Sequence, residues 1–296
     1  DLVRSRGLGD VYKRQSSNTA EPTIAILGSG NMAGAVLEGV LASETVGSRP
    51  ILVTTRSQAS ADAYTADERV RAVSLEADPD ANTAAAAEAD VIVLGVKPQM
   101  LVALLDEIAP AVKPGAICIS VAAGISIATI EAALPAQVRV IRAMPNTPAA
   151  IGRGATGIAA GTRADQEAMS IAEAIFATAG TVVTVPEEQI AHVAAISGSG
   201  PAYVYYFIEA LTDAGVAHGL DPEVAADLAH QTFAGASELA SRRRDLGAAE
   251  LRRRVTSPKG TTEQAIRVFD EADVRAILER AVAANIRRSE ELAAQA

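Results

Sequence analysis

At residues 23–33 the chain reads Thr-Ile-Ala-Ile-Leu-Gly-Ser-Gly-Asn-Met-Ala. The apolar, β-branched start of this stretch predicts a buried strand, and residues 31–42 predict a helix. A G-x-G-x-x-A pattern between a strand and a helix is a dinucleotide fingerprint. Its first glycine permits a tight turn, its second lets the backbone approach a pyrophosphate, and its alanine lets the helix pack against the sheet. Unpaired N–H groups at the helix start favour the anion. The residues predicted to bind the pyrophosphate are Gly28, Ser29, Gly30, Asn31 and Met32.

Apolar strands and Ala-rich helical stretches alternate through the first half of the chain. Further strands are predicted at residues 51–54, 91–94, 116–121 and 138–141, with two more at the sheet edge, 155–160 and 181–185. Strands that are apolar along their whole length indicate a parallel sheet covered on both faces. After Pro186 only helical periodicity is evident. The predicted fold class is α/β, with an N-terminal Rossmann-type, mostly parallel sheet and a C-terminal all-helical domain.

The predicted domain boundaries follow from this change of character. Residues 22–186 are expected to form the nucleotide-binding Rossmann domain and residues 187–296 the helical domain. Residues 1–21 are set apart because their start is basic, carries Gly and Ser, and has no apolar segment that would mark a secretory signal. We predict a disordered extension there, or a stretch that is not native coding sequence.

Composition excludes several classes of function. The formal net charge of −10 argues against a nucleic-acid partner, which needs concentrated positive charge, and no apolar stretch is long enough to span a bilayer. The one cysteine, Cys118, lies in an apolar run that predicts a buried strand residue rather than a reactive thiol, so a reducing, cytoplasmic setting is expected. No metal-ligand spacing is present. The histidines, His192, His218 and His230, are interpreted as surface or packing residues.

The end of the second predicted strand bears on the choice of nicotinamide. An NAD enzyme usually places a carboxylate there for the ribose 2′-OH, but this strand continues into Thr55-Arg56-Ser57. Arg56 can pair with a 2′-phosphate, and the two hydroxyls can donate hydrogen bonds to it. The sequence therefore favours NADPH over NADH.

Two later strand ends point toward the same crevice, because ligands of open α/β sheets bind outside the carboxyl ends of the strands. We expect these turns to line the nicotinamide side, and Lys97 to contact a ribose or a phosphate. The residues assigned to this side are Gly95, Val96, Lys97, Pro98, Ala122, Ala123 and Gly124.

At this point the chain resembles the pyrroline-5-carboxylate reductase family over nearly everything after the N-terminal tail. The matching stretches are Leu27–Met32, Val96–Gln99, Val121–Gly124, Arg142–Pro148, Ser197–Tyr203 and Val255–Thr262. The resemblance implies reduction of 1-pyrroline-5-carboxylate to L-proline with NAD(P)H as hydride donor. It also implies an intertwined dimer, in this family often assembled further into a decamer.

The resemblance assigns further site residues. It implies that the turn from Ser257 to Thr262 holds the substrate, with the N–H groups of Thr261 and Thr262 on its carboxylate and the Thr262 hydroxyl, the predicted catalytic group, at the ring nitrogen. The other residues carried over are Gly260 and Glu188 for the substrate and Asn82 and Arg254 for the cofactor.

Three features of these stretches leave alternatives open. Lys259 stands where the family has glycine, so the turn differs slightly, or Lys259 adds a charge near the substrate carboxylate. The glycines after Ser197 predict close packing within the helical core, with Ser197 and Ser199 as weaker site candidates, or a helix kink. Asn146 either serves the site or only satisfies local backbone groups.

Two other functions are weighed against the reductase. Another NADP-linked imine or 3-hydroxyacid reductase would rely on a catalytic Lys or acidic residue in its helical domain, where Lys259 is the only lysine. A non-catalytic NADP sensor would keep the glycine loop but has no reason to keep the turn from Ser257 to Thr262.

Overall fold

The computed structural model describes residues 22–43 and 49–293 and divides them into two compact units. The first unit runs to Gly198 and includes the chain from Ile286 onward, and the second spans Ser199–Asn285. The extension predicted over residues 1–21 lies outside the described residues. Within the described ranges, no helix combines the length and the apolarity needed to cross a bilayer.

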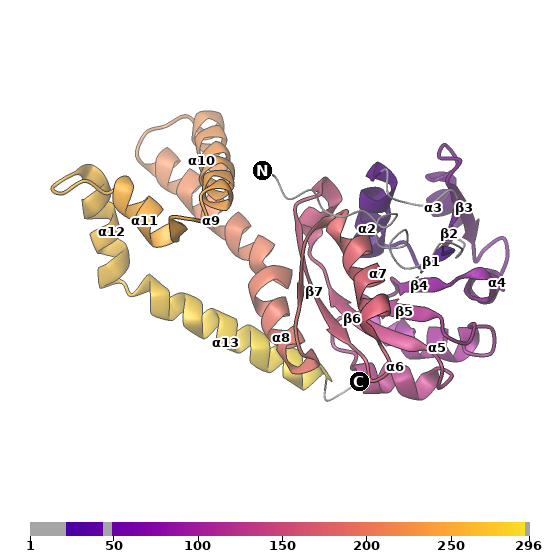
Figure 1. The fold of residues 1–296 in the computed structure, drawn as a ribbon. Coiled ribbons are helices and arrows are strands. Elements are labelled where there is room, and N and C mark those ends of the chain that lie inside the picture. Colours follow the sequence, from indigo (N-terminus) through magenta and orange to yellow (C-terminus); the bar gives the residue numbers. More distant parts are fainter. Residues whose placement is uncertain (1–21, 44–48, 294–296) are drawn as a thin grey trace. The chain divides into compact units, whose positions relative to one another are not determined.

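The first unit is built on an eight-stranded sheet whose strands follow the order β3-β2-β1-β4-β5-β6-β7-β8. Strands β1 to β6 pair in parallel, β7 is antiparallel to β6, and β8 is parallel to β7. This confirms the predicted mostly parallel, Rossmann-type sheet (Figure 1). The strands are β1 (Ile24–Leu27), β2 (Ile51–Thr55), β3 (Val70–Ser74), β4 (Val91–Leu94), β5 (Ile117–Ser120), β6 (Arg139–Met144), β7 (Gly154–Ala160) and β8 (Gly180–Thr184).

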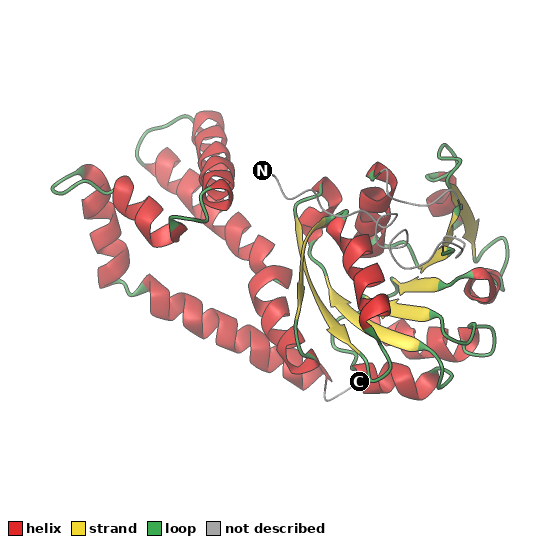
Figure 2. Cartoon of the chain, in the orientation of Figure 1, coloured by secondary structure: helices red, strands yellow, loops and turns green. Residues whose placement is uncertain are grey.

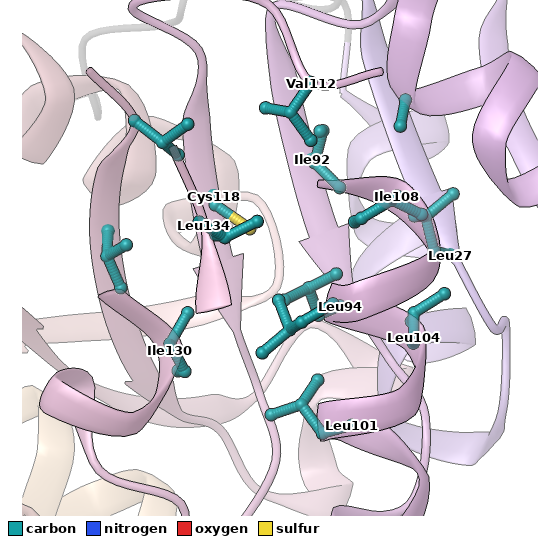
Figure 3. Packing of buried hydrophobic residues seen from close by; sticks show 14 of the residues in the cluster. Leu27, Ile92, Leu94, Leu101, Leu104, Ile108, Val112, Cys118, Ile130 and Leu134 are labelled. Carbon is teal, nitrogen blue, oxygen red and sulfur yellow. The ribbon is translucent and has the colours of Figure 1, made fainter. Parts of the chain in front are cut away.

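Helices cover both faces of this sheet. Alternate residues of the central strands point to opposite sides, and both sets are apolar, so each face needs a cover. Leu27, Leu94 and Cys118 pack on one side with α4 (Ala81–Glu88), α5 (Pro98–Ile108) and α6 (Ile127–Ala133), as Figure 3 shows for part of this cluster. Ile26 and Val93 pack on the other side with α2 (Asn31–Ala42) and α7 (Gln166–Ala177). The predicted helix over residues 31–42 is confirmed. Cys118 is fully buried, and burial raises the pKa of its thiol to about 12, as expected of a packing residue.

One strand was not predicted. β3 lies at the edge of the sheet and pairs only with β2. It carries Arg71, whose guanidinium reaches solvent and pairs with Glu88 at 2.6 Å. An edge strand with a half-polar pattern has a much weaker hydrophobic signal than the buried central strands.

The chain between the sheet and the helical half belongs to the first unit. It forms η2 (Glu187–Gln189), α8 (Ile190–Val193) and the π-turn η3 (Ala194–Gly198). Ile190 is 1% exposed and joins the core beneath the sheet. At Gly198 an added Cβ would lie 2.7 Å from Met144 Cε, so this glycine packs against β6 rather than within the helical core as predicted. For this reason the compact unit extends past residue 186.

The second unit is all helical, as predicted (Figure 2). Its helices are α9 (Gly200–Ala217), α10 (Pro222–Arg242), α11 (Gly247–Arg254), α12 (Thr261–Glu271) and the first part of α13 (Val274–Ala293). Between Ser199 and Asn285 only Ala225 and Ala229 are buried in the single chain. Tyr205 and Tyr206 are 60% and 68% exposed. A helical unit with so little core of its own has apolar faces left for association.

Candidate functional site

The first part of the site is the switch point of the sheet, where the chain leaves β1 and β4 side by side. The N–H of Gly95 donates to the carbonyl of Leu27 at 2.8 Å, and Gly28 adopts φ +81. A Cβ built on Gly28 would lie 2.7 Å from Val96 Cγ1, and one built on Gly95 would overlap the Gly28 carbonyl and Ala33 Cβ. Only glycine allows the two turns to approach in this way.

The start of α2 presents hydrogen-bond donors without protein acceptors. Among the residues that the structure describes, none accepts a bond from the N–H groups of Asn31, Met32 and Ala33. The hydroxyl of Ser29 is buried and has no partner there either. Buried polar groups are rarely left unsatisfied, and a phosphate at this helix start would accept from all of them. The predicted pyrophosphate loop therefore has the donors that the cofactor requires.

The end of β2 presents one cation and two hydroxyls. Arg56 is exposed and has no hydrogen bond or ion pair with any described residue. The Thr55 hydroxyl is buried and donates to the carbonyl of Ser57 at 2.9 Å, while the Ser57 side chain caps the short helix α3 (Gln58–Asp62). Arg56 is thus the group free to meet a 2′-phosphate, and Thr55 and Ser57 shape the turn that carries it.

Asn82 and Lys97 are two further residues of the predicted nucleotide side. Asn82 is 6% exposed on α4, and its amide has no hydrogen bond to another described residue. Lys97 is exposed at the N-cap of α5, whose first residue is Pro98. A buried, unpaired amide is the kind of group that a bound ligand satisfies.

A cavity of about 840 Å³ lies within the first unit, beside these strand ends. It brings together four residues assigned from the sequence: Pro98, Ala123, Gly124 and Glu188. Glu188 is exposed, and Ala122 beside the cavity is buried with its N–H bonded to Ser120 Oγ at 3.2 Å. The end of α13 also contributes to the wall.

Among the charged residues of the cavity wall, Arg142 and Glu187 form a pair to which the sequence had assigned no role. Arg142 on β6 has a side chain only 12% exposed, and its Nη1 lies 3.1 Å from Glu187 Oε1. The same oxygen of Glu187 accepts the N–H of Ile127 at 2.6 Å. An arginine directly after the predicted strand 138–141 was the available signal, since a charge on a buried strand needs a partner.

The predicted substrate turn lies in the second unit. Gly260 donates its N–H to the Ser257 carbonyl at 2.9 Å, and an added Cβ there would lie 2.5 Å from Ser257 Oγ. The N–H groups of Thr261 and Thr262, the first residues of α12, have no acceptor among the described residues. They form a receptor for an anion such as a carboxylate.

Lys259 adopts φ +61, the left-handed conformation that glycine accepts most easily. Its N–H donates to Glu263 Oε2 at 2.8 Å, which stabilises the turn. The turn therefore has a backbone conformation typical of glycine at a position occupied by lysine.

Arg254 is held on its own helix. It pairs with Glu250 at 2.8 Å, as does Arg253, and the hydrogen bonds from these two residues lower the pKa of Glu250 to about 2. Asn146 bonds two backbone groups: its Nδ2 donates to the Ser197 carbonyl at 2.9 Å, and its Oδ1 accepts the Ala155 N–H at 2.8 Å. Asn146 therefore satisfies backbone groups, one of them distant in the sequence, and a role in the site stays a prediction.

Comparison with known proteins places the two halves in recognised families. Residues 187–292 match the family model for pyrroline-5-carboxylate reductase dimerisation, and residues 23–124 match the model for coenzyme F420-dependent NADP oxidoreductases. A pyrroline-5-carboxylate reductase of Pseudomonas aeruginosa is 40% identical over 93% of this chain and 98% of its own length.

Solved structures agree over the same extent. A pyrroline-5-carboxylate reductase from Coxiella burnetii superposes with a TM-score of 0.85 at 36% identity, covering 92% of this chain and 99% of the other. The Plasmodium falciparum pyrroline carboxylate reductase, solved with NADP bound, has a TM-score of 0.79 at 25% identity and covers 93% and 100%. The match to a dimerisation model supports self-association.

Proposed function

Because the chain belongs to the pyrroline-5-carboxylate reductase family, we propose that it reduces 1-pyrroline-5-carboxylate to L-proline with NADPH, the final step of proline biosynthesis. The observation that carries this proposal is the similarity along almost the whole chain, together with a switch point that has the shape and the donors for a dinucleotide. We propose a cytoplasmic protein.

In this proposal the cofactor lies over the switch point. The loop from Gly28 to Met32 would hold the pyrophosphate through the unpaired donors at the start of α2. Arg56 would pair with the 2′-phosphate, and the amide of Asn82 would bond the nucleotide. The turns at Gly95 and Ala122 would border the nicotinamide.

The substrate is proposed to bind through its carboxylate. The N–H groups of Thr261 and Thr262 would donate hydrogen bonds to this carboxylate, and Ser257 and Gly260 would shape the turn behind them. Thr262 Oγ1 would bond the ring nitrogen, and Glu188 would face the cationic ring. The domain assignment proposed is 22–186 for the cofactor and 187–296 for dimerisation and substrate, with Arg254 close to the cofactor.

The proposed reduction needs few acid–base groups from the protein. When bound, NADPH supplies a hydride to the carbon of the protonated imine, which is already electrophilic. The protein aligns the two rings, excludes water and holds the carboxylate. The proposed unit of assembly is a dimer, and a decamer is the larger assembly to test.

The proposal is tested by following NADPH oxidation with 1-pyrroline-5-carboxylate and, in parallel, with 3-hydroxyacids. We expect turnover of the imine alone. Thr262→Ala should lower kcat/KM by about 10-fold to 100-fold, the loss expected for one hydrogen bond to a charged group, with NADPH affinity unchanged. Thr65→Ala, which removes an exposed hydroxyl bonded to the Asp62 carbonyl, is the control.

Each alternative has its own result in this assay. Turnover of hydroxy acids but not of the imine would favour the hydroxyacid reductase, and tight NADPH binding without any turnover would favour the sensor. An active wild type with an unaffected Thr262→Ala variant would remove Thr262 from the site while leaving the reaction in place.

A further inference from the structure

The cavity of the first unit contains a charge pair that has not been given a role in the proposed reaction. Arg142 and Glu187 lie on its wall, 3.1 Å apart, and the Arg142 side chain is almost enclosed. Holding a guanidinium out of water requires a close partner. In the proposed function Glu188 of the same cavity faces the cationic ring, so the role of an arginine in this wall needs an explanation.

We propose that Glu187 is a positioning residue for imine reduction, which anchors the loop on the nicotinamide side and cancels the positive charge of Arg142. The inference rests on the proposed function and deepens it. Neither role was assigned from the sequence, where only the neighbouring Glu188 was given a place in the site.

The anchoring role follows from three segments that meet at one carboxylate oxygen. Glu187 Oε1 accepts from Arg142 on β6 and from the N–H of Ile127, the first residue of α6. The loop Val121–Ser126, which carries Ala122 to Gly124, ends directly before Ile127. Glu187 therefore links this loop to the sheet and to the turn after β8. Removing its carboxylate would leave the Ile127 N–H and the guanidinium without their acceptor.

The electrostatic role follows from the charges around the cavity. Within the described residues its walls carry Arg142 from β6, Glu187 and Glu188 from η2, and Glu290 from α13, while its residues from α5, the β5–α6 loop, α8 and η3 are uncharged. With Glu187 in place, Arg142 is neutralised and the remaining charges are carboxylates. Such a site favours the protonated imine, the form that accepts hydride.

The sign of the effect of Glu187→Gln follows directly. The substitution leaves Arg142 without its counter-charge beside the ring, so the bound imine loses its proton more easily. The alkaline limb of the kcat profile reports groups in the enzyme–substrate complex. We expect its midpoint to move to lower pH by about one unit, with kcat at the wild-type optimum lowered by about 10-fold.

The experiment measures kcat against pH with saturating NADPH and 1-pyrroline-5-carboxylate. Arg142→Met combined with Glu187→Gln restores the net charge, so its midpoint should return to within a few tenths of the wild-type value although kcat stays low. Glu187→Asp keeps the charge but shortens the reach, and should lower kcat with an unshifted midpoint. Glu88→Gln, which breaks an exposed glutamate–arginine pair of the same unit, should match wild type.

Three results would overturn the proposal. One is an unshifted midpoint for Glu187→Gln, and another is a double variant that stays shifted as far as the single one. The third is an effect that disappears with unsubstituted 1-pyrroline, because Arg142 would then bind the substrate carboxylate. A wild type that turns over no imine contradicts the proposed function itself. An active wild type with any of the three results contradicts this inference alone.

Discussion

Gly28 and Gly95 face each other across the switch point of the sheet, with no room for a side chain on either. A Cβ on Gly95 would overlap the carbonyl oxygen of Gly28, and one on Gly28 would press on Val96. The fingerprint glycine is therefore half of a pair, and the other half follows a strand more than sixty residues later in the chain. The depth of the dinucleotide crevice depends on both.

Gly95→Ala should weaken NADPH binding more than 10-fold and lower the free energy of unfolding by about 1–3 kcal/mol, because the methyl group forces the two turns apart. Fluorescence titration with NADPH and urea unfolding measure the two effects. Gly34→Ala is the matched control, since its Cβ would lie 3.5 Å from the Tyr64 hydroxyl, an ordinary contact. Equal NADPH affinities in the two variants would contradict the pairing argument.

Arg56→Ala should reduce affinity for NADPH by about 10-fold to 100-fold and leave NADH affinity unchanged, because the lost hydrogen bonds are made to the 2′-phosphate alone. Dissociation constants for both nucleotides give the ratio. Arg71→Ala removes an exposed arginine from the neighbouring strand and controls for net charge. If Arg56→Ala kept the wild-type preference for NADPH, another group would have to recognise the phosphate.

Lys259→Gly should raise the free energy of unfolding by about 0.5–1 kcal/mol, because glycine adopts φ +61 without strain and this gain exceeds its extra chain entropy. The change is read from the midpoint of urea unfolding at fixed protein concentration. Asp273→Gly is the comparison. Asp273 has φ +50 but also accepts the N–H of Ala276, so glycine should gain less there. A destabilised Lys259→Gly protein would show that the lysine side chain itself supports the turn.

Asp90 should contribute to acid sensitivity. Partial burial raises its pKa, but hydrogen bonds from Lys113 and from the Thr23 N–H outweigh this and lower the pKa below its usual range. Its stabilising effect is then complete above the unfolded-state pKa of about 3.9 and is lost as pH falls through the lowered value. Asp90→Asn should flatten the fall of unfolding free energy below about pH 4. Asp106→Asn controls for one charge, and equal acid slopes in Asp90→Asn and wild type would contradict the prediction.

The nucleotide half could be predicted from the sequence because its signals are local. A buried parallel strand is apolar along its length, so these strands were placed correctly, and the glycine turn lies directly after β1 as expected. β3 was not predicted, because this edge strand buries few of its residues and carries the charged Arg71. A run of apolar or β-branched residues is therefore easier to recognise than a short strand interrupted by a charge.

The charge pair in the cavity could not be predicted for a different reason. Arg142 and Glu187 lie on elements far apart in the sequence, and only the folded sheet brings β6 beside the turn after β8. Two adjacent glutamates look alike in a sequence, yet Glu187 is bonded and Glu188 is exposed. The backbone angle of Lys259 likewise depends on its contact with Glu263, which no pattern of residue types records.

The scarcity of buried residues between Ser199 and Asn285 has a consequence for how the protein must be handled. Because apolar helix faces such as that of Tyr205 and Tyr206 gain cover only on association, the midpoint of thermal unfolding should rise with protein concentration, as light scattering and calorimetry can check together. A midpoint independent of concentration would contradict this. If the midpoint does depend on concentration, dilution would unfold the helical half under mild conditions. Assays at nanomolar enzyme would then measure dissociation as well as catalysis.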